Sequence, residues 1–424
     1  MAVDLSFCRA EFPCLSQVKV AGQPAAYFDG PGGTQVPQRV LDAMTHYLIH
    51  TNANTGKTSQ TSIESDATIA RARQALADML GAGSPDEIAL GANMTTLNFN
   101  LARALARNLG PGDEVMVTEL DHDANVAPWL TIAEDKGATV QWARVDTETC
   151  TLDMHDLEAK LSPRTKIVAV VLSSNATGTV SDVTRIARMA KAVGATVVVD
   201  AVHAAPHLPI DVKAIGCDFL LCSVYKFFGP HIGVLWGRPE AFAALKTYKV
   251  RPQYDYAPYK IETGTLNHEG IAGSAAAVDF IADLGRVVRG GSAPLATVGT
   301  PERRQQIING LIAIEEHETV LLARLLAGFA QIPGLKTYGP PPGHPRTPTV
   351  SFTLAGVAPG AVTTALGQKA IFIGDGNFYA KTIIDRLGLT PTGGVARVGL
   401  APYNTAEEVD RLVSAVQALA MQAR

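Results

Sequence analysis

The chain has 424 residues, 47% of them hydrophobic, and a formal net charge of -4. At about 150 residues per domain, this length predicts two or three domains around a large core. Basic and acidic residues nearly balance, at 36 against 40. This balance excludes a broad electrostatic surface for nucleic acid, although not a local basic patch, so we expect no nucleic-acid partner.

No uncharged apolar run reaches about 18 residues, so we expect no membrane-spanning segment. The N-terminal sequence MAVDLSFCRAEFPCL lacks the basic and apolar regions of a signal peptide. The five cysteines include no C-x-x-C pair, which suits reduced thiols better than a disulfide framework or a zinc site. We therefore expect a cytoplasmic protein without a metal site.

Short apolar runs alternate with helix-like segments between residues 86 and 236. The expected strands are residues 87–90, 114–118, 140–143, 167–172, 196–199, 219–222 and 233–236. The expected helices are residues 95–107, 126–136, 154–160 and 183–193. Runs such as KIVAVVL are apolar throughout, which is typical of strands buried on both faces. The alternation predicts an α/β fold with a mainly parallel sheet covered by helices on both sides.

The pattern changes after residue 284, where a Gly-, Pro- and Ser-rich stretch precedes a long helix expected at 302–331. Further elements are expected at 349–354 and 396–400 (strands), at 360–368 (helix) and from 406 onward (helix). This order predicts a smaller α+β domain. We expect an N-terminal arm (1–27) that packs with the small domain, a large domain (28–285), a linker (286–302) and the small C-terminal domain (303–424).

Two charged residues follow neighbouring buried runs, at the strand ends where ligands bind in parallel sheets. Asp200 closes TVVVD, and Lys226 comes soon after DFLLC. Asp200 has a structural interpretation, as a helix cap or ion-pair partner, and a functional one, as a carboxylate that faces a protonated ring nitrogen. Lys226 likewise is interpreted as a surface lysine packed on its aromatic neighbours, or as a partly desolvated amine that forms a Schiff base. Together they favour pyridoxal phosphate, which needs a lysine and a carboxylate.

Other polar residues also follow expected strands. The chain has no P-loop and no G-x-G-x-x-G motif. Thr95 and Thr96 open a helix, where an anion site or an ordinary cap is expected, and Ser223 could add a hydroxyl. His122 is either structural or stacked on a planar cofactor, and Asn175 either contacts a ring oxygen or belongs to a turn.

His203 and His207 have the i, i+4 spacing of metal ligands. Pro206 between them and the lack of a third ligand argue against zinc.

The combination resembles the class V aminotransferase group of fold-type I pyridoxal-phosphate (PLP) enzymes, in particular its cysteine desulfurase and selenocysteine lyase branch. The resemblance runs from the FPCL and YFDG segments near the N-terminus to RVGLAPYN near the C-terminus. It implies a large domain with a mainly parallel seven-stranded sheet, a smaller C-terminal domain, and PLP as cofactor.

The resemblance also implies residue roles. Lys226 would be the Schiff-base lysine, Asp200 would pair with the pyridinium nitrogen, His122 would stack on the ring, and Asn175 would lie near its oxygen. The residues implied for the phosphate are Thr95, Thr96 and Ser223, with Thr265 donated by the second subunit of a homodimer. Arg397 would bind the carboxylate of an α-amino-acid substrate.

The chain departs from this family at three points. The stretch 371–381 matches a loop that carries the catalytic cysteine in desulfurases, but it contains none, and all five cysteines lie elsewhere. His203 stands where the family commonly has glutamine near the cofactor. Tyr225 replaces the histidine that usually precedes the Schiff-base lysine. We count Lys226, His122 and His203 as the expected catalytic residues, because they can move protons near the substrate.

We therefore expect a cysteine desulfurase-like lyase that cleaves a C–S or related bond on the β-side of a free amino acid, without a persulfide-forming cysteine. Open alternatives are a class V aminotransferase, an amino-acid epimerase, or a decarboxylating or aldol-type PLP enzyme. A non-catalytic relative is disfavoured, because Lys226, Asp200, His122 and Arg397 are all present.

Overall fold

The computed structural model describes residues 3–291 and 294–423. Residues 1–2, 292–293 and 424, which fall in the expected arm, linker and small domain, lie outside the described residues. Within the described ranges, no helix combines the length and apolar character needed to cross a membrane.

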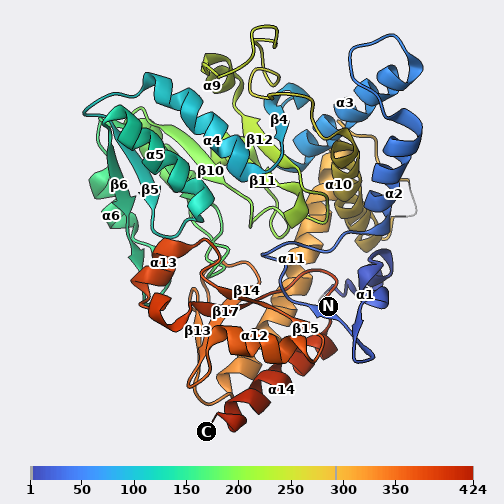
Figure 1. The fold of residues 1–424 in the computed structure, drawn as a ribbon, viewed down its shortest axis with the longest axis vertical. Coiled ribbons are helices and arrows are strands. Elements are labelled where there is room, and N and C mark those ends of the chain that lie inside the picture. Colours follow the sequence, from blue (N-terminus) through green and yellow to red (C-terminus); the bar gives the residue numbers. More distant parts are fainter. Residues whose placement is uncertain (1–2, 292–293, 424) are drawn as a thin grey trace.

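A seven-stranded sheet forms the centre of the larger part of the molecule (Figure 1). Its order is β4-β12-β11-β10-β9-β5-β6. Only β12 runs antiparallel to its neighbours. The strands are β4 (Ile88–Gly91), β5 (Glu114–Thr118), β6 (Thr139–Ala143), β9 (Thr165–Val171), β10 (Thr196–Asp200), β11 (Phe219–Ser223) and β12 (Gly233–Gly237). The expected mainly parallel sheet is confirmed, with each strand within two residues of its expected bounds.

Helices cover both faces of this sheet because neighbouring residues of one strand point to opposite sides. In β5, Val115 and Val117 pack in one buried cluster with α4 (Met94–Leu105), α5 (Ala127–Lys136) and α9 (Pro239–Ala244). Met116 of the same strand packs in the other cluster. The helices of the large domain that contribute to that second cluster are α2 (Gln38–His46), α3 (Gln60–Leu80), α6 (Met154–Lys160), α7 (Val183–Ala192), α8 (Val212–Ile215) and α10 (His268–Val288). Two helices described below, in the N-terminal arm and at the domain junction, also contribute to it.

The smaller C-terminal part contains an antiparallel sheet of order β13-β14-β17-β16. Its strands are β13 (Leu335–Tyr338), β14 (Thr349–Leu354), β16 (Gly374–Gly376) and β17 (Val395–Gly399). Its helices are α11 (Pro301–Ala330), α12 (Pro359–Gly367), α13 (Lys381–Arg386) and α14 (Ala406–Gln422). The expected strands β14 and β17 and the expected helices α11, α12 and α14 are found, whereas β13, β16 and α13 were not anticipated.

The N-terminal arm contacts both domains: Leu5, Cys8, Phe12 and Leu15 are buried in the large-domain core, whereas its last strand pairs with a strand of the small domain. It begins with a 3-10 turn and α1 (Cys14–Gln17), followed by a hairpin of β1 (Lys19–Val20) and β2 (Gln23–Pro24). β3 (Ala26–Tyr27) then pairs in parallel with β15 (Ile371–Phe372). Arg9 forms an ion pair with Glu408 at 2.9 Å. These contacts hold the segment that follows the arm, residues 28–34, beside the end of β17.

Helix α11 connects the two parts, as Figure 1 shows. Its first half buries Ile307, Leu311 and Ile314 in the large-domain core, and its second half buries Leu325 and Phe329 in the small-domain core. α10 continues into the expected linker before the chain turns back into α11.

The contact between α10 and α11 depends on two glycines, Gly285 and Gly310. A Cβ atom on Gly310 would collide with the backbone oxygen of Ile281, and one on Gly285 would collide with the backbone oxygen of Gln306. Neither helix backbone can yield without opening the packed cores around it.

We therefore predict that Gly310→Ala lowers the free energy of unfolding by about 1–3 kcal/mol, the usual cost of overpacking. Gly367→Ala in α12 is the matched control. A Cβ atom at position 367 meets no atom within 4 Å. Since alanine is more favourable than glycine in a helix by up to about 1 kcal/mol, this control should not be destabilised. Urea denaturation measures both. Equal effects of the two substitutions would contradict the close helix contact.

Candidate active site

Two adjoining cavities open where the carboxyl ends of the large-sheet strands meet the small domain. The inner cavity has a volume of about 530 Å³ and the outer cavity about 1150 Å³. Asp200, Ser223 and His203 line the inner cavity, whereas Asp29 and Arg397 line the outer one. Both cavities are lined by Pro31, Thr95, His122, Ala124, Asn175, Tyr225 and Lys226. The two volumes are therefore parts of one continuous site.

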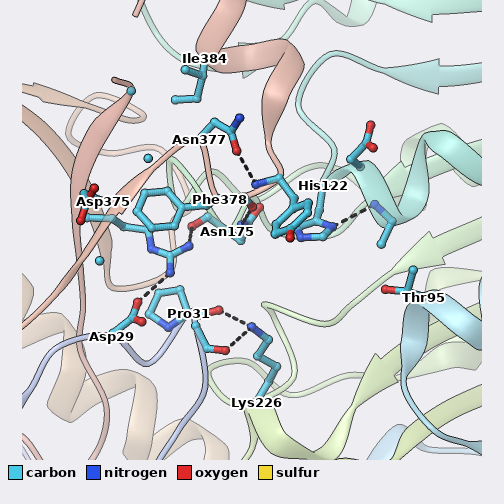
Figure 2. Close-up of a pocket in the computed structure, with 18 of the residues that line it drawn as sticks. Asp29, Pro31, Thr95, His122, Asn175, Lys226, Asp375, Asn377, Phe378 and Ile384 are labelled. Carbon is cyan, nitrogen blue, oxygen red and sulfur yellow. Dashed lines mark hydrogen bonds and ion pairs between the residues drawn. The ribbon is translucent and has the colours of Figure 1, made fainter. Parts of the chain in front are cut away.

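Lys226 lies at the junction of the two cavities (Figure 2). It closes a 3-10 turn that follows β11 directly, so the end of a buried strand fixes its position. Its Nζ atom donates hydrogen bonds to the backbone oxygens of Pro31 and of Gly32, the latter at 2.9 Å. Burial and then the nearby charge of Arg397 lower the pKa of Lys226 to about 7. The side chain is therefore a substantial fraction free amine at neutral pH, as imine formation requires.

Asp200 is a buried carboxylate at the end of β10. Its Oδ1 accepts a hydrogen bond from the backbone N–H of Val202 at 2.8 Å. Burial raises the pKa of Asp200 to about 6, against the lowering effects of that hydrogen bond and of Lys226. Among the described residues, no arginine or lysine forms an ion pair with it. A protonated ring nitrogen would supply the missing positive partner.

His122 follows β5 and presents a neutral imidazole to both cavities. Its Nδ1 accepts a hydrogen bond from the backbone N–H of Ala124 at 3.0 Å. The proton of the neutral ring is therefore on Nε2. Burial, with smaller contributions from Lys226 and Arg397, lowers the pKa of His122 to about 4. The ring lies 5.5 Å from the ring of Tyr379, tilted by 32°.

The N-terminus of α4 forms one end of the inner cavity. Asn93 caps this helix by accepting a hydrogen bond from the N–H of Thr96 at 2.9 Å, and the Ser223 hydroxyl accepts one from the N–H of Met94 at 3.0 Å. The hydroxyls of Thr95, Thr96 and Ser223 therefore gather at the positive end of a helix dipole. This combination suits a phosphate group.

Asn175 bridges the large domain and the loop after β16. Its Nδ2 donates a hydrogen bond to the backbone oxygen of Phe378 at 2.9 Å. Its Oδ1 is buried and has no hydrogen-bond partner among the described residues. One Nδ2 hydrogen and the Oδ1 acceptor therefore remain for a group bound in the cavity.

His203 is buried in the wall of the inner cavity. Its Nε2 lies 3.0 Å from the hydroxyl of Thr349 in β14. Burial lowers the pKa of His203 well below its usual value, with His207 as the next cause. His207 in turn contacts Glu318 of α11 at 2.8 Å. Within residues 3–291 and 294–423, no three metal-ligating side chains gather in a site.

Arg397 is buried in the middle of β17 and reaches the outer cavity. Its Nη2 forms an ion pair with Asp29 at 2.7 Å, and its Nη1 donates to the backbone oxygen of Asn175 at 3.1 Å. The guanidinium carbon lies 3.7 Å from the centroid of the Phe378 ring. Three contacts thus orient the guanidinium beside Lys226, where it can bind a carboxylate.

Thr265 is the one predicted site residue that the structure does not bring to these cavities in the same chain. It lines a separate cavity together with Arg73, Glu262 and His268. Its contact with the cofactor of a second subunit stays a prediction.

Sequence reasoning assigned no individual role to Asp29, Phe378 or Tyr379. Asp29 was visible only as part of YFDG. The two aromatic residues belong to the stretch 371–381, which the resemblance matches to the catalytic loop of the family without assigning either of them a role. Tyr225, noted as a departure, lines both cavities and stacks on His231 with ring centroids 4.8 Å apart.

The inner cavity fits pyridoxal phosphate. Its lining combines an unpaired buried carboxylate, the hydroxyl-rich N-terminus of α4 and a lysine of lowered pKa. Lys226, Asp200, His122, Asn175, Thr95, Thr96 and Ser223 are the residues that would hold it.

Comparison with known proteins also points to a PLP-dependent family. The family model described as aminotransferase class V matches residues 26–288 and 288–412. A probable cysteine desulfurase of Mycolicibacterium paratuberculosis is 33% identical over 98% of the chain, which spans 58% of that relative. An aminotransferase-like protein of Gibberella zeae is 34% identical over 96% of both chains. The apo structure of a cysteine desulfurase from Thermococcus onnurineus NA1 superposes with a TM-score of 0.85 at 26% identity, over 100% of this chain and 99% of that one.

These matches confirm the expected family, fold class and cofactor. They do not assign roles to individual residues, which follow from the geometry above.

We predict that the cofactor-free protein attaches PLP through Lys226, at a rate that rises with pH around a midpoint near 7. Only the neutral amine attacks an aldehyde, and an ordinary lysine would lose its proton only near pH 10. Stopped-flow absorbance gives the rate, and borohydride reduction with peptide mapping gives the site. Lys226→Ala should abolish attachment, whereas Lys166→Ala on the exposed surface should not. A midpoint above about pH 9, or trapping on another lysine, would overturn the assignment.

Proposed function

Because the chain belongs to the class V aminotransferase family of PLP enzymes, we propose that it acts on a free α-amino acid as a cysteine desulfurase-like lyase. In this proposal it cleaves a C–S or related bond on the β-side without forming a persulfide on the protein. One observation carries the proposal. Lys226, Asp200 and Arg397 surround one continuous site, and no cysteine is found among the described residues that line it.

Each residue of the site has a distinct task in this proposal. When bound, PLP supplies an electron-accepting ring that stabilises negative charge at the substrate Cα. Asp200 holds the proton on the ring nitrogen, and Arg397 holds the substrate carboxylate. The Nζ of Lys226, of lowered pKa, takes and returns the Cα proton. His122, with its proton on Nε2, would contact the ring, and His203 in the cavity wall is held by its contact with Thr349.

The cysteines support a route without a persulfide. Cys8, Cys150, Cys217 and Cys222 are buried. Burial raises the pKa of Cys8 and of Cys217 to about 12. Cys14 is half-buried in the N-terminal arm and lines neither cavity. Since the thiolate is the reactive form, the leaving group would depart directly, as sulfide, sulfinate or a thiol.

An aminotransferase is the second candidate. The relative named aminotransferase-like is 34% identical to this chain, and transamination would use the same lysine, carboxylate and arginine. We further propose that the protein works as a cytoplasmic homodimer, in which Thr265 of each subunit contacts the phosphate bound by the other.

We predict that the PLP-loaded protein converts L-cysteine or its sulfinate with unchanged activity after alkylation by iodoacetamide, and in the Cys14→Ala variant. Product analysis identifies the chemistry. Alanine indicates desulfurase-type cleavage, in which the sulfur passes to a free thiol in solution or leaves the sulfinate as sulfite. Pyruvate indicates α,β-elimination, and a keto acid that retains the side chain indicates transamination. Loss of activity in proportion to modification of one cysteine would contradict the proposal of a route without a persulfide.

We also predict that Arg397→Ala weakens amino-acid binding by about tenfold to a hundredfold, the worth of a charged hydrogen-bonded contact. Isothermal titration of the PLP-loaded protein with L-alanine measures this. Arg324→Ala is the control, because Arg324 pairs with Asp410 on the exposed surface. Unchanged affinity in Arg397→Ala would remove the carboxylate-binding role.

A further inference from the structure

The loop after β16 holds an unusual backbone conformation at the site. Phe378 and Tyr379 are consecutive and both left-handed, with φ of 54° and 56°. Such residues cost free energy and persist where the surrounding structure holds them, often in binding sites. We call residues 377–380, between β16 and α13, the capping loop.

Three hydrogen bonds hold the capping loop in place. The Asn175 side chain donates to the backbone oxygen of Phe378, and the N–H of Asp123 donates to that of Tyr379 at 2.6 Å. Within the loop, Asn377 accepts from the N–H of Tyr379 at 3.0 Å. Asn175 and Asp123 come from the segments after β9 and β5. Two large-domain residues, Asn175 and Asp123, therefore fix the position of the loop through its backbone oxygens.

The two aromatic rings contact two different site residues. The ring of Phe378, which is labelled in Figure 2, packs against the Arg397 guanidinium. Tyr379 lies over His122 and is 72% exposed, although it lines the outer cavity. Among the described residues, none forms a hydrogen bond with its hydroxyl. Tyr379 thus presents an uncovered ring and hydroxyl to whatever enters the outer cavity.

The fixed groups leave one direction for a substrate side chain. The cofactor would occupy the inner cavity, Arg397 would hold the carboxylate, and Lys226, which lines both cavities, would face the reacting carbon. The side chain then enters the outer cavity towards Tyr379. That cavity, about 1150 Å³, exceeds the range of about 300–1,000 Å³ typical of sites for drug-sized ligands. The side chain of free cysteine is too short to cover the tyrosine ring.

We propose that Tyr379 is a specificity-determining residue, and that the preferred substrate is an S-substituted L-cysteine whose sulfur substituent packs on its ring. This rests on the proposed lyase function. A thioether sulfur and an apolar group both contact aromatic rings favourably. Phe378 acts indirectly, by holding the Arg397 guanidinium at the other end of the substrate.

The lack of a cysteine in the site dictates how the C–S bond breaks. Lys226 takes the Cα proton, and the Cβ–S electron pair leaves with the sulfur, which picks up a proton to give a thiol. The released enamine hydrolyses with one water. The balance is R–S–CH₂–CH(NH₃⁺)–COO⁻ + H₂O → R–SH + pyruvate + NH₄⁺, and no oxidant or reductant is needed.

The test compares binding of two amino acids that have no leaving group on Cβ. L-Homophenylalanine is the carbon analogue of S-phenyl-L-cysteine, and L-alanine lacks the side chain. We expect the PLP-loaded protein to bind the former at least about tenfold more tightly, as ring contacts of this kind suggest. Tyr379→Asn should reduce the ratio to about one, because asparagine tolerates the left-handed backbone but removes the ring.

Two controls isolate the ring. Tyr379→Phe should keep the affinity ratio, and so should Phe7→Ala, which removes an exposed aromatic side chain from the N-terminal arm. Equal binding of both ligands by the wild-type protein, or an unchanged ratio in Tyr379→Asn, would overturn the assignment.

Cleavage is scored separately, as thiophenol and pyruvate released from S-phenyl-L-cysteine. If the affinity ratios are as expected but no thiophenol or pyruvate is released, the lyase function is refuted and the role of Tyr379 in side-chain binding is retained. Cleavage with an unchanged ratio would refute the side-chain site alone.

Discussion

The site depends on the burial of charge at the junction of the two domains. Asp200 and Arg397 are buried at the end of β10 and in the middle of β17, and Lys226 is partly buried in the turn that follows β11. Only Arg397 has an ion-pair partner, Asp29, among the described residues. The cost of this burial appears as the lowered pKa of Lys226 and the raised pKa of Asp200. A cofactor and a substrate carboxylate would supply charges opposite to those of Asp200 and Arg397. Because burial makes an unpaired charge unfavourable, it also makes binding of an oppositely charged ligand more favourable.

The sequence predicts those parts of the protein whose signal is local. Each strand of the large sheet is a short apolar run, and Asp200 and Lys226 follow such runs directly, so both the sheet and its reactive edge could be inferred. The small domain was harder. β16 is the sequence GDG, which has no apolar alternation, and it forms a strand only because β17 pairs with it. Phe378 and Tyr379 reach the site through the same tertiary arrangement.

The departures from the family pattern are connected in space. His203 is in the wall of the inner cavity and contacts Thr349 of the small sheet. Tyr225 lines the junction of the cavities, and Tyr379 stands over His122. No cysteine is found among the described residues that line the two cavities, and aromatic rings and imidazoles of lowered pKa lie there instead.

Helix α11 has a consequence for how the molecule unfolds. One continuous helix of 30 residues is buried in both cores, and its contact with α10 leaves no room for a side chain at Gly285 and Gly310. A continuous helix that is packed in both cores couples the two domains to each other. For the same reason the two domains should lose their structure in a single cooperative transition, with the backbone amides of α11 among the slowest in the protein to exchange with solvent.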